Sequence, residues 1–248
     1  MIILKSSREI EKIRVSGGIV AEVLEEVKKK VTPGVRSKDI DRMAEELIRK
    51  KGGIPAFKGY RGYPSTACIS VNDEIVHGIP SERIFKEGDI VSIDIGVIKD
   101  GYYGDAAITV PVGEISGEAR RLLEVTEESL YKGIEKAVPG NRVSDISCAV
   151  QNFVESAGYS VVREYVGHGI GRSLHEDPPV PNFGETGKGP RIKCGMVLAI
   201  EPMVNAGKSD LHVLDNGWTA VTRDKSLSAH FEHTVAITEY GHLILTVL

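Results

Sequence analysis

The stretch Pro33-Gly34-Val35-Arg36-Ser37-Lys38-Asp39-Ile40 recurs later in the chain as Pro139-Gly140-Asn141-Arg142-Val143-Ser144-Asp145-Ile146. Pro, Gly, Arg, Asp and Ile coincide in the two copies at an offset of 106 residues, and Gly52 and Gly158 keep the same offset. The alternative is chance similarity between short Pro-Gly segments. Because a period of this length is too long for a solenoid, we favour an internal duplication within one domain.

Segments of matching type surround the two copies. Helical periodicity covers four segments, Ser7–Lys30, Lys38–Lys51, Glu118–Ala137 and Ser144–Ala157. Further on, Gly88-Asp89-Ile90-Val91-Ser92-Ile93-Asp94 matches Gly195-Met196-Val197-Leu198-Ala199-Ile200-Glu201 at an offset of 107. We therefore expect residues 1–248 to form one domain of two related halves, roughly 10–105 and 116–212, each a helix pair followed by strands. Both copies of the duplicated strand end in an acid.

Composition limits the kinds of partner. The 248 residues are 41% hydrophobic and 27% charged with a net charge of -4, so neither nucleic acid nor an anionic membrane is indicated. No apolar run is long enough for a membrane span, and the segment Met1–Lys5 is too short for a signal-peptide core. The three cysteines are widely spaced and form no CxxC pair, which is typical of free thiols in a reducing compartment. We expect a cytoplasmic protein.

Two acids are predicted to share one face of a hairpin. If Asp100-Gly101 forms a two-residue turn, Asp94 faces Ala107 and Asp105 becomes a diagonal neighbour of Asp94. Two carboxylates on one face of an apolar hairpin repel each other unless a proton or a cation joins them.

Further acids and histidines extend this pattern. Glu201 follows an apolar, strand-like run, and Glu232 lies within another. The stretch 167–176, GHGIGRSLHE, holds His168 and His175 on a glycine-rich loop, with a spacing that differs from helical metal motifs. Each acid alone could be a capping or solvated residue, and His175 a surface histidine. Four acids beside buried strands, however, require neutralisation, and oxygen ligands with an imidazole suit divalent Mn, Fe, Co or Zn.

Together these residues resemble the type I methionine aminopeptidases of the compact bacterial kind, and the resemblance extends over nearly the whole chain. Its motifs are Gly59-Tyr60-Arg61-Gly62-Tyr63-Pro64, Cys68-Ile69-Ser70-Val71-Asn72, His77-Gly78-Ile79-Pro80, Asp94-Ile95-Gly96, Gly104-Asp105, Gly167-His168-Gly169-Ile170-Gly171, His175-Glu176, Ile200-Glu201-Pro202 and Phe231-Glu232-His233-Thr234. The resemblance implies an α+β pita-bread fold, in which pseudo-twofold halves form a central antiparallel sheet covered by two helix pairs.

The resemblance also implies a dinuclear metallo-hydrolase that removes the initiator methionine and favours small second residues. Two divalent cations (Co, Mn, Fe or Zn) are expected: Asp94 binds the first, His168 and Glu201 bind the second, and Asp105 and Glu232 bridge them. Such a pair activates water and stabilises the charge that develops on the substrate.

Catalytic and pocket roles follow from the same resemblance. Glu201 moves the proton of the water, His175 hydrogen-bonds the carbonyl oxygen, and His77 contacts the substrate beyond the cleaved bond. An apolar methionine slot is implied for Tyr60, Tyr63, Cys68, Trp218, Phe57 and Leu174. Phe57 stands where a smaller residue is expected, and Leu174 where an aromatic is common. Four other histidines fall outside the metal motif, although either His212 or His233 could line the cleft; they are His212, His230, His233 and His242.

Three other activities remain as alternatives: a prolidase or aminopeptidase P, a creatinase relative, and a non-catalytic peptide-binding module. A prolidase or aminopeptidase P usually has a large domain ahead of the catalytic one, whereas here the catalytic helices begin at once. A non-catalytic module typically lacks metal ligands. Expected partners are the N-termini of nascent chains, with the ribosome as a candidate contact and a monomer as the favoured state.

Overall fold

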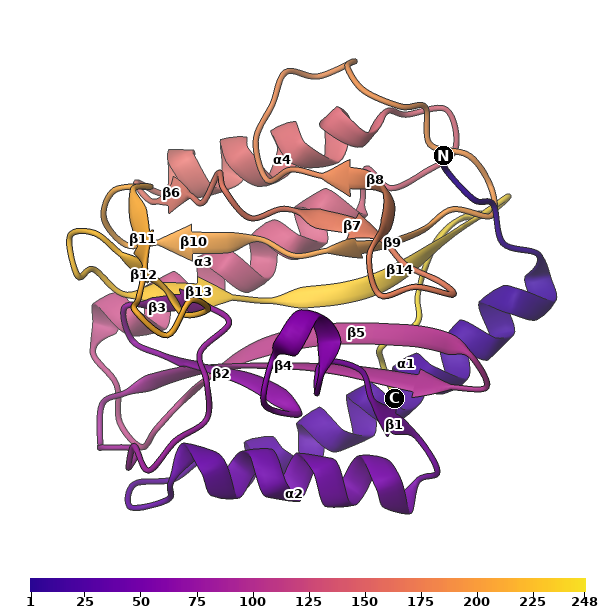
Figure 1. The fold of residues 1–248 in the computed structure, drawn as a ribbon. Coiled ribbons are helices and arrows are strands. Elements are labelled where there is room, and N and C mark those ends of the chain that lie inside the picture. Colours follow the sequence, from indigo (N-terminus) through magenta and orange to yellow (C-terminus); the bar gives the residue numbers. More distant parts are fainter.

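A curled, nine-stranded antiparallel sheet runs through the centre of the molecule (Figure 1). The computed structural model describes residues 1–248. Seven strands follow in the order β1 (Ile54–Pro55), β4 (Ile90–Lys99), β5 (Tyr102–Pro111), β14 (Glu232–Thr238), β9 (Val197–Ile200), β7 (Gly167–Gly169) and β8 (Glu176–Val180). The other two, β2 (Ala67–Val71) and β15 (Gly241–Ile244), pair with β4 and β14.

Two small three-stranded sheets lie beside the central one. The first contains β13 (Ser228–His230), β10 (Met203–Asn205) and β6 (Ser160–Val161). The second contains β11 (Leu211–Val213), β12 (Ala220–Thr222) and β3 (Glu74–Val76). A single 3-10 turn, η1 (Tyr60–Gly62), lies in the loop ahead of β2.

Four helices cover one face of the sheet, as the periodicity predicts. They are α1 (Ser7–Lys28), α2 (Ser37–Lys50), α3 (Gly117–Ile134) and α4 (Val143–Ser156). All four end before their predicted ends, α2 and α4 by a single residue, and α1 and α3 by more, since their predicted ends were Lys30 and Ala137. After α1 and α3 the backbone forms 3-10-type hydrogen bonds, which span three residues instead of four. The Lys30 N–H donates to the Val27 carbonyl (2.9 Å), and the Ala137 N–H donates to the Ile134 carbonyl (2.9 Å). None of the four helices has the length and apolar character needed to cross a bilayer.

The repeated Pro-Gly stretch occupies equivalent places in the two halves. The Gly34 N–H donates to the Phe85 carbonyl (2.9 Å), and the Gly140 N–H donates to the Ile192 carbonyl (3.1 Å). Both glycines have a left-handed backbone, with φ of 92° and 96°, which glycine adopts without steric cost. Each copy thus ties the loop between two helices to the segment that leads into the duplicated strand, β4 or β9.

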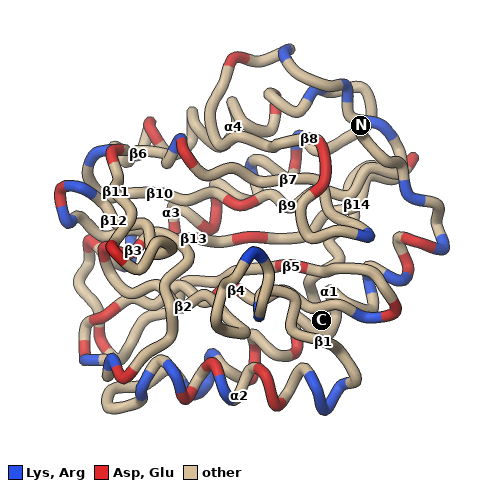
Figure 2. Tube along the Cα trace, viewed as in Figure 1, with Lys and Arg blue, Asp and Glu red and all other residues tan.

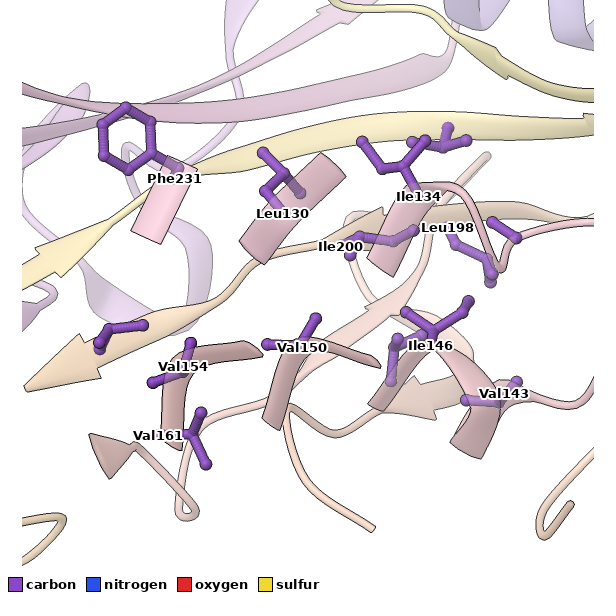
Figure 3. Packing of buried hydrophobic residues seen from close by; sticks show 14 of the residues in the cluster. Leu130, Ile134, Val143, Ile146, Val150, Val154, Val161, Leu198, Ile200 and Phe231 are labelled. Atoms are coloured by element: carbon purple, nitrogen blue, oxygen red, sulfur yellow. The ribbon is translucent and has the colours of Figure 1, made fainter. Parts of the chain in front are cut away.

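Each helix pair has its own hydrophobic cluster. The pair α1 and α2 packs on β2, β4 and β5, through residues such as Leu24, Ile48 and Ile93. The pair α3 and α4 packs on β9 and β14, and Figure 3 shows Leu130 and Ile200 in this cluster. Because side chains alternate along a strand, the acids that end or lie between these apolar positions face away from the helices.

A buried ion pair ties the N-terminal segment to Glu176, the first residue of β8. Lys5 Nζ lies 2.5 Å from Glu176 Oε2, and the two side chains are only 4% and 8% exposed. The other carboxylate oxygen of Glu176 accepts hydrogen bonds from the backbone N–H groups of Arg172 (2.8 Å) and Ser173 (3.2 Å). Lys5 therefore neutralises the acid that shapes the loop carrying His175.

Replacing Lys5 should destabilise the protein. In Lys5→Met, Glu176 stays buried without its cation, and breaking such a pair costs about 3–5 kcal/mol. Urea unfolding measures this loss. The matched control is Lys29→Met, because Lys29 pairs with Glu26 on the surface (2.8 Å), where both groups remain hydrated. Equal stability of the two variants would contradict the structural role of Lys5.

Candidate metal centre

The hairpin of β4 and β5 places two carboxylates on the face opposite the helices. Asp94 pairs with Ala107 and Gly96 pairs with Asp105, so the predicted register is confirmed. The turn residues Asp100 and Gly101 have φ of 51° and 78°, as a type I′ turn requires. Asp94 and Asp105 are therefore diagonal neighbours on one face.

The next strands bring a second pair of acids into the same row. Glu232 on β14 pairs with Ala107, so Asp94, Ala107 and Glu232 lie side by side across three strands. Ile200 on β9 pairs with His233, which places Glu201 beside Glu232. Ala107 has only a methyl group, so space remains above it between the carboxylates.

Burial makes this cluster electrostatically unfavourable by itself. Asp105 is 4% exposed and Glu232 is 2% exposed, and Asp94 Oδ1, Asp105 Oδ1 and Glu232 Oε1 have no hydrogen-bond partner. Desolvation raises the pKa of Asp94 to about 7, and desolvation together with neighbouring carboxylates raises the pKa of Asp105 and of Glu232 well above its usual range. Figure 2 shows acidic positions within the central strands, with the basic positions mainly on the outer helices and loops.

His168 completes the cluster from β7. Its pairing with Ala199 puts the ring on the same face, and Nδ1 lies 2.9 Å from the Gly169 carbonyl. Burial, followed by His175, lowers the pKa of His168 to about 3, so the ring is neutral. When Nδ1–H donates to that carbonyl, the lone pair of Nε2 points towards Glu201 Oε1 (3.5 Å) and Asp105 Oδ2 (4.0 Å).

This donor set fits a divalent metal. Three possible ligand atoms, one each from Asp105, His168 and Glu232, lie within 4.8 Å of one another. Buried, unpartnered carboxylate oxygens beside a neutral imidazole are the ligands that Mn, Fe, Co and Zn accept.

One cavity of about 280 Å³ contains every candidate site residue that the sequence indicates. These are Phe57, Tyr60, Tyr63, Cys68, His77, Asp94, Asp105, His168, Leu174, His175, Glu201, Trp218 and Glu232. Six further lining residues were not predicted: Arg61, Val76, Tyr165, Val166, Met203 and His230.

The possibility that His212 or His233 lines the cleft is not confirmed, because neither lines this cavity. His212 is on β11, away from the central sheet. His233 follows Glu232 directly, so its ring points to the opposite face, where Nδ1 lies 2.9 Å from Thr246 Oγ1. The alternation of side chains along β14 was the signal that could have excluded His233.

Aromatic and apolar side chains form the other end of the cavity. The rings of Tyr63 and Trp218 meet edge to face with centroids 5.1 Å apart, and the Tyr63 hydroxyl donates to the Gly78 carbonyl (2.9 Å). Cys68 on β2 pairs with Asp94, so the apolar wall passes directly into the acidic cluster. Phe57 and Leu174 are both buried against this wall.

His175 lines the cavity between His168 of the metal cluster and Tyr60 of the aromatic wall. Its ring centroid is 4.3 Å from that of His168, and its Nδ1 is 2.8 Å from the Tyr60 hydroxyl. Burial, and then the charge of Arg61, lowers the pKa of His175, so this ring is neutral at pH 7. A neutral, oriented imidazole here can donate one hydrogen bond into the cavity.

Comparison with known proteins agrees with this geometry. Metallopeptidase family M24 matches residues 11–239. The chain belongs to metallopeptidase family M24. Methionine aminopeptidase 1 of Bacillus subtilis is 57% identical in sequence to this chain, and the alignment covers 99% of each protein. The crystal structure of a methionine aminopeptidase from Thermotoga maritima superposes with a TM-score of 0.99 at 50% identity, over 100% of both chains.

Within family M24 the chain is a type I methionine aminopeptidase of the bacterial kind. The prolidase from Pyrococcus horikoshii is 26% identical with a TM-score of 0.81, and the chain covers 64% of it. The expected α+β pita-bread fold is therefore confirmed, and the prolidase shares it.

The metal-free M24 protein should lose stability as pH rises. The pKa of Asp94 is about 7 in the folded protein and about 3.9 in the unfolded chain. The stabilisation of the folded state by protonated Asp94 is therefore complete only below the unfolded pKa, and it is lost as pH rises through the folded pKa. Urea unfolding in EDTA should therefore show the free energy of unfolding falling from about pH 6.5 to about pH 8. Below about pH 6.5, the usual histidine pKa, the lowered pKa of His168 acts in the opposite direction.

Saturating Co²⁺ should remove this decline, because deprotonated carboxylates bind the cation. Asp94→Asn, which lacks the titrating group, should show a shallower decline in EDTA. A metal-free protein that is equally stable at both ends of the range would contradict the electrostatic account of the cluster.

Proposed function

We propose that this enzyme removes the initiator methionine from nascent proteins and peptides and favours small second residues. The observation that carries the proposal is that one cavity joins an apolar, aromatic slot to a buried cluster of carboxylates and imidazole. Such a cavity suits a substrate with an apolar first side chain and a polar peptide bond directly beside it. The high identity to methionine aminopeptidases over the full chain supports the same activity.

The centre is proposed to hold two divalent cations, of Co, Mn, Fe or Zn. Asp94 would bind the first, His168 and Glu201 the second, and Asp105 and Glu232 would bridge them. The four carboxylates together carry a charge that two dications cancel. A pair of such cations supplies an activated water and polarises the scissile carbonyl.

The side chains around the cations would transfer the proton, stabilise the developing charge and contact the substrate. Water adds to the carbonyl carbon, the C–N bond breaks, and Glu201 passes the proton of the water to the leaving amine. A Tyr60 hydroxyl that donates to Nδ1 of His175 leaves Nε2 of that ring protonated. Nε2–H can then donate to the carbonyl oxygen as negative charge develops on it. His77, which lines the same cavity, would contact the substrate beyond the cleaved bond.

The methionine side chain is proposed to enter between Tyr60, Tyr63, Cys68 and Trp218, with Phe57 and Leu174 closing the slot. Thioether sulfur makes favourable contacts with aromatic ring edges, and the edge-to-face pair of Tyr63 and Trp218 supplies such a wall. Both departures from the family pattern remain apolar, so the slot keeps its character.

Several wider assignments complete the proposal. Residues 1–248 would form one catalytic domain that contains the two repeats. Partners would be nascent polypeptide N-termini, met at the ribosome, in the cytoplasm. The enzyme would act as a monomer, without specificity for nucleic acid or membranes.

A substrate panel tests the activity. With Co²⁺ or Mn²⁺ added, we expect release of methionine from Met-Ala-Ser, and no turnover of an Xaa-Pro dipeptide or of creatine. Asp105→Ala is expected to be inactive, because its position serves both cations. Cleavage at proline without release of methionine would assign a prolidase, and background rates on all three would favour a peptide-binding module.

Two variants should separate the roles of Tyr60 and His175. His175→Ala should lower kcat by roughly 10²–10³, in line with the loss of an oxyanion donor, while metal content stays unchanged. Tyr60→Phe keeps the ring in the slot and removes only the hydrogen bond to Nδ1, worth about 0.5–1.5 kcal/mol. Its kcat should fall less, with KM little changed.

Steady-state kinetics on Met-Ala-Ser and metal analysis measure these effects. Loss of metal from His175→Ala would show that this histidine is a ligand. A wild-type kcat in Tyr60→Phe would show that the hydroxyl does not orient the ring.

A further inference from the structure

His230 is a cavity histidine to which the proposed mechanism gives no role. It ends β13 and precedes Glu232 by two residues on the same extended segment. Its backbone is held on β5 by Thr109, whose hydroxyl donates to the His230 carbonyl (2.8 Å) and accepts from the His230 N–H (2.9 Å). On its other side it pairs with Met203 of β10. The backbone that carries the ring is therefore held in place beside the acidic cluster.

The imidazole of His230 is buried and incompletely bonded. The residue is 2% exposed, and Nε2 is one of the few buried polar side-chain atoms without a hydrogen-bond partner. Most buried polar groups in proteins are hydrogen-bonded, so an unpartnered one calls for a function. The nearest acidic oxygen to this nitrogen is Oε2 of Glu201, at 3.8 Å.

Glu201 lies between two imidazoles, with one oxygen facing each. Its Oε1 is 3.5 Å from Nε2 of His168, whereas its Oε2 faces Nε2 of His230. The hydrogen bond that involves Glu201 is made by its main-chain carbonyl, which accepts from Asn182 Nδ2 (2.9 Å). The two imidazoles are thus the donor-capable side chains that face the two carboxylate oxygens.

We propose that His230 is a positioning residue for Glu201: Nε2–H donates to Oε2 and keeps Oε1 turned towards His168. A small rotation of either side chain shortens the 3.8 Å separation to the ~2.9 Å of a hydrogen bond. A partner of this kind orients a metal-ligating carboxylate without contacting the cation. The inference rests on the proposed metal centre.

Direct ligation by His230 fits the geometry less well. His168 Nε2 faces two of the proposed ligands, Glu201 Oε1 (3.5 Å) and Asp105 Oδ2 (4.0 Å), whereas the acidic oxygen near His230 Nε2 belongs to Glu201 (3.8 Å). The His230 ring instead faces the Glu201 oxygen that points away from His168. The two roles differ in chemistry: positioning needs an N–H donor, whereas ligation needs an imidazole lone pair.

Two substitutions distinguish these roles. Glutamine keeps an N–H donor but has no imidazole, and leucine keeps bulk without any polar atom. Full-length wild-type, His230→Gln and His230→Leu proteins are stripped of metal, and Co²⁺ binding is measured by calorimetry and by the visible absorption of bound Co²⁺. His230→Leu should bind Co²⁺ about 10–100-fold more weakly, as is typical when the partner of a ligand is removed, with an altered spectrum. His230→Gln should retain near-wild-type affinity and spectrum.

The matched control is His233→Leu, three residues further along the chain and on the opposite face. Its ring contacts Thr246 and Tyr131 instead of the cavity, so its Co²⁺ affinity should equal that of wild type even if its unfolding midpoint falls. Urea unfolding of all metal-free variants separates loss of folding from loss of binding.

Each outcome has one meaning. Wild-type affinity in His230→Leu overturns the positioning role, and equal weakening in the leucine and glutamine variants overturns it in favour of ligation. Absence of Co²⁺ binding by the wild-type protein overturns the metal centre itself and with it this inference.

Discussion

Four carboxylates crowd one face of an apolar sheet, and their desolvation and mutual repulsion are the constraint on which the site depends. An isolated buried carboxylate costs several kcal/mol, so the cluster requires neutralisation by cations or protons. The sheet register determines where this charge accumulates. Because a slip by one residue reverses the face of every side chain, Asp94 and Glu232 would enter the helix-packed core if β4 or β14 shifted.

The helix pairs and the two similar Pro-Gly turns hold this register. In each half a Pro-Gly turn is bonded to the segment before the duplicated strand, through Phe85 in one half and Ile192 in the other. The helix pairs then anchor the alternate positions of that strand, such as Ile93 and Leu198, in their clusters. The acids at the ends of the duplicated strand face the other way, towards the shared cavity. The two sequence copies thus contribute acids to one centre from corresponding strands, β4 and β9.

Much of this arrangement was accessible from the sequence. The Asp100-Gly101 turn determined which face Asp105 occupies, and the helical periodicity predicted the four helices within a few residues. Family resemblance, and not periodicity, indicated Tyr60 and Trp218, because loop residues carry no periodic signal. His230 was missed for a different reason: its importance depends on the distance to Glu201, from another strand, and on the lack of a partner. Neither property can be read from local sequence.

The separate hydrophobic clusters of the two halves have a kinetic consequence. Each helix pair can collapse on its own strands, whereas Asp94 and Asp105 come from one half and His168 and Glu201 from the other. During refolding, secondary structure and local cores can therefore form before the halves dock, as is common in chains of this size. The catalytic pocket exists only once docking is complete, so recovery of enzymatic turnover reports the final step of assembly.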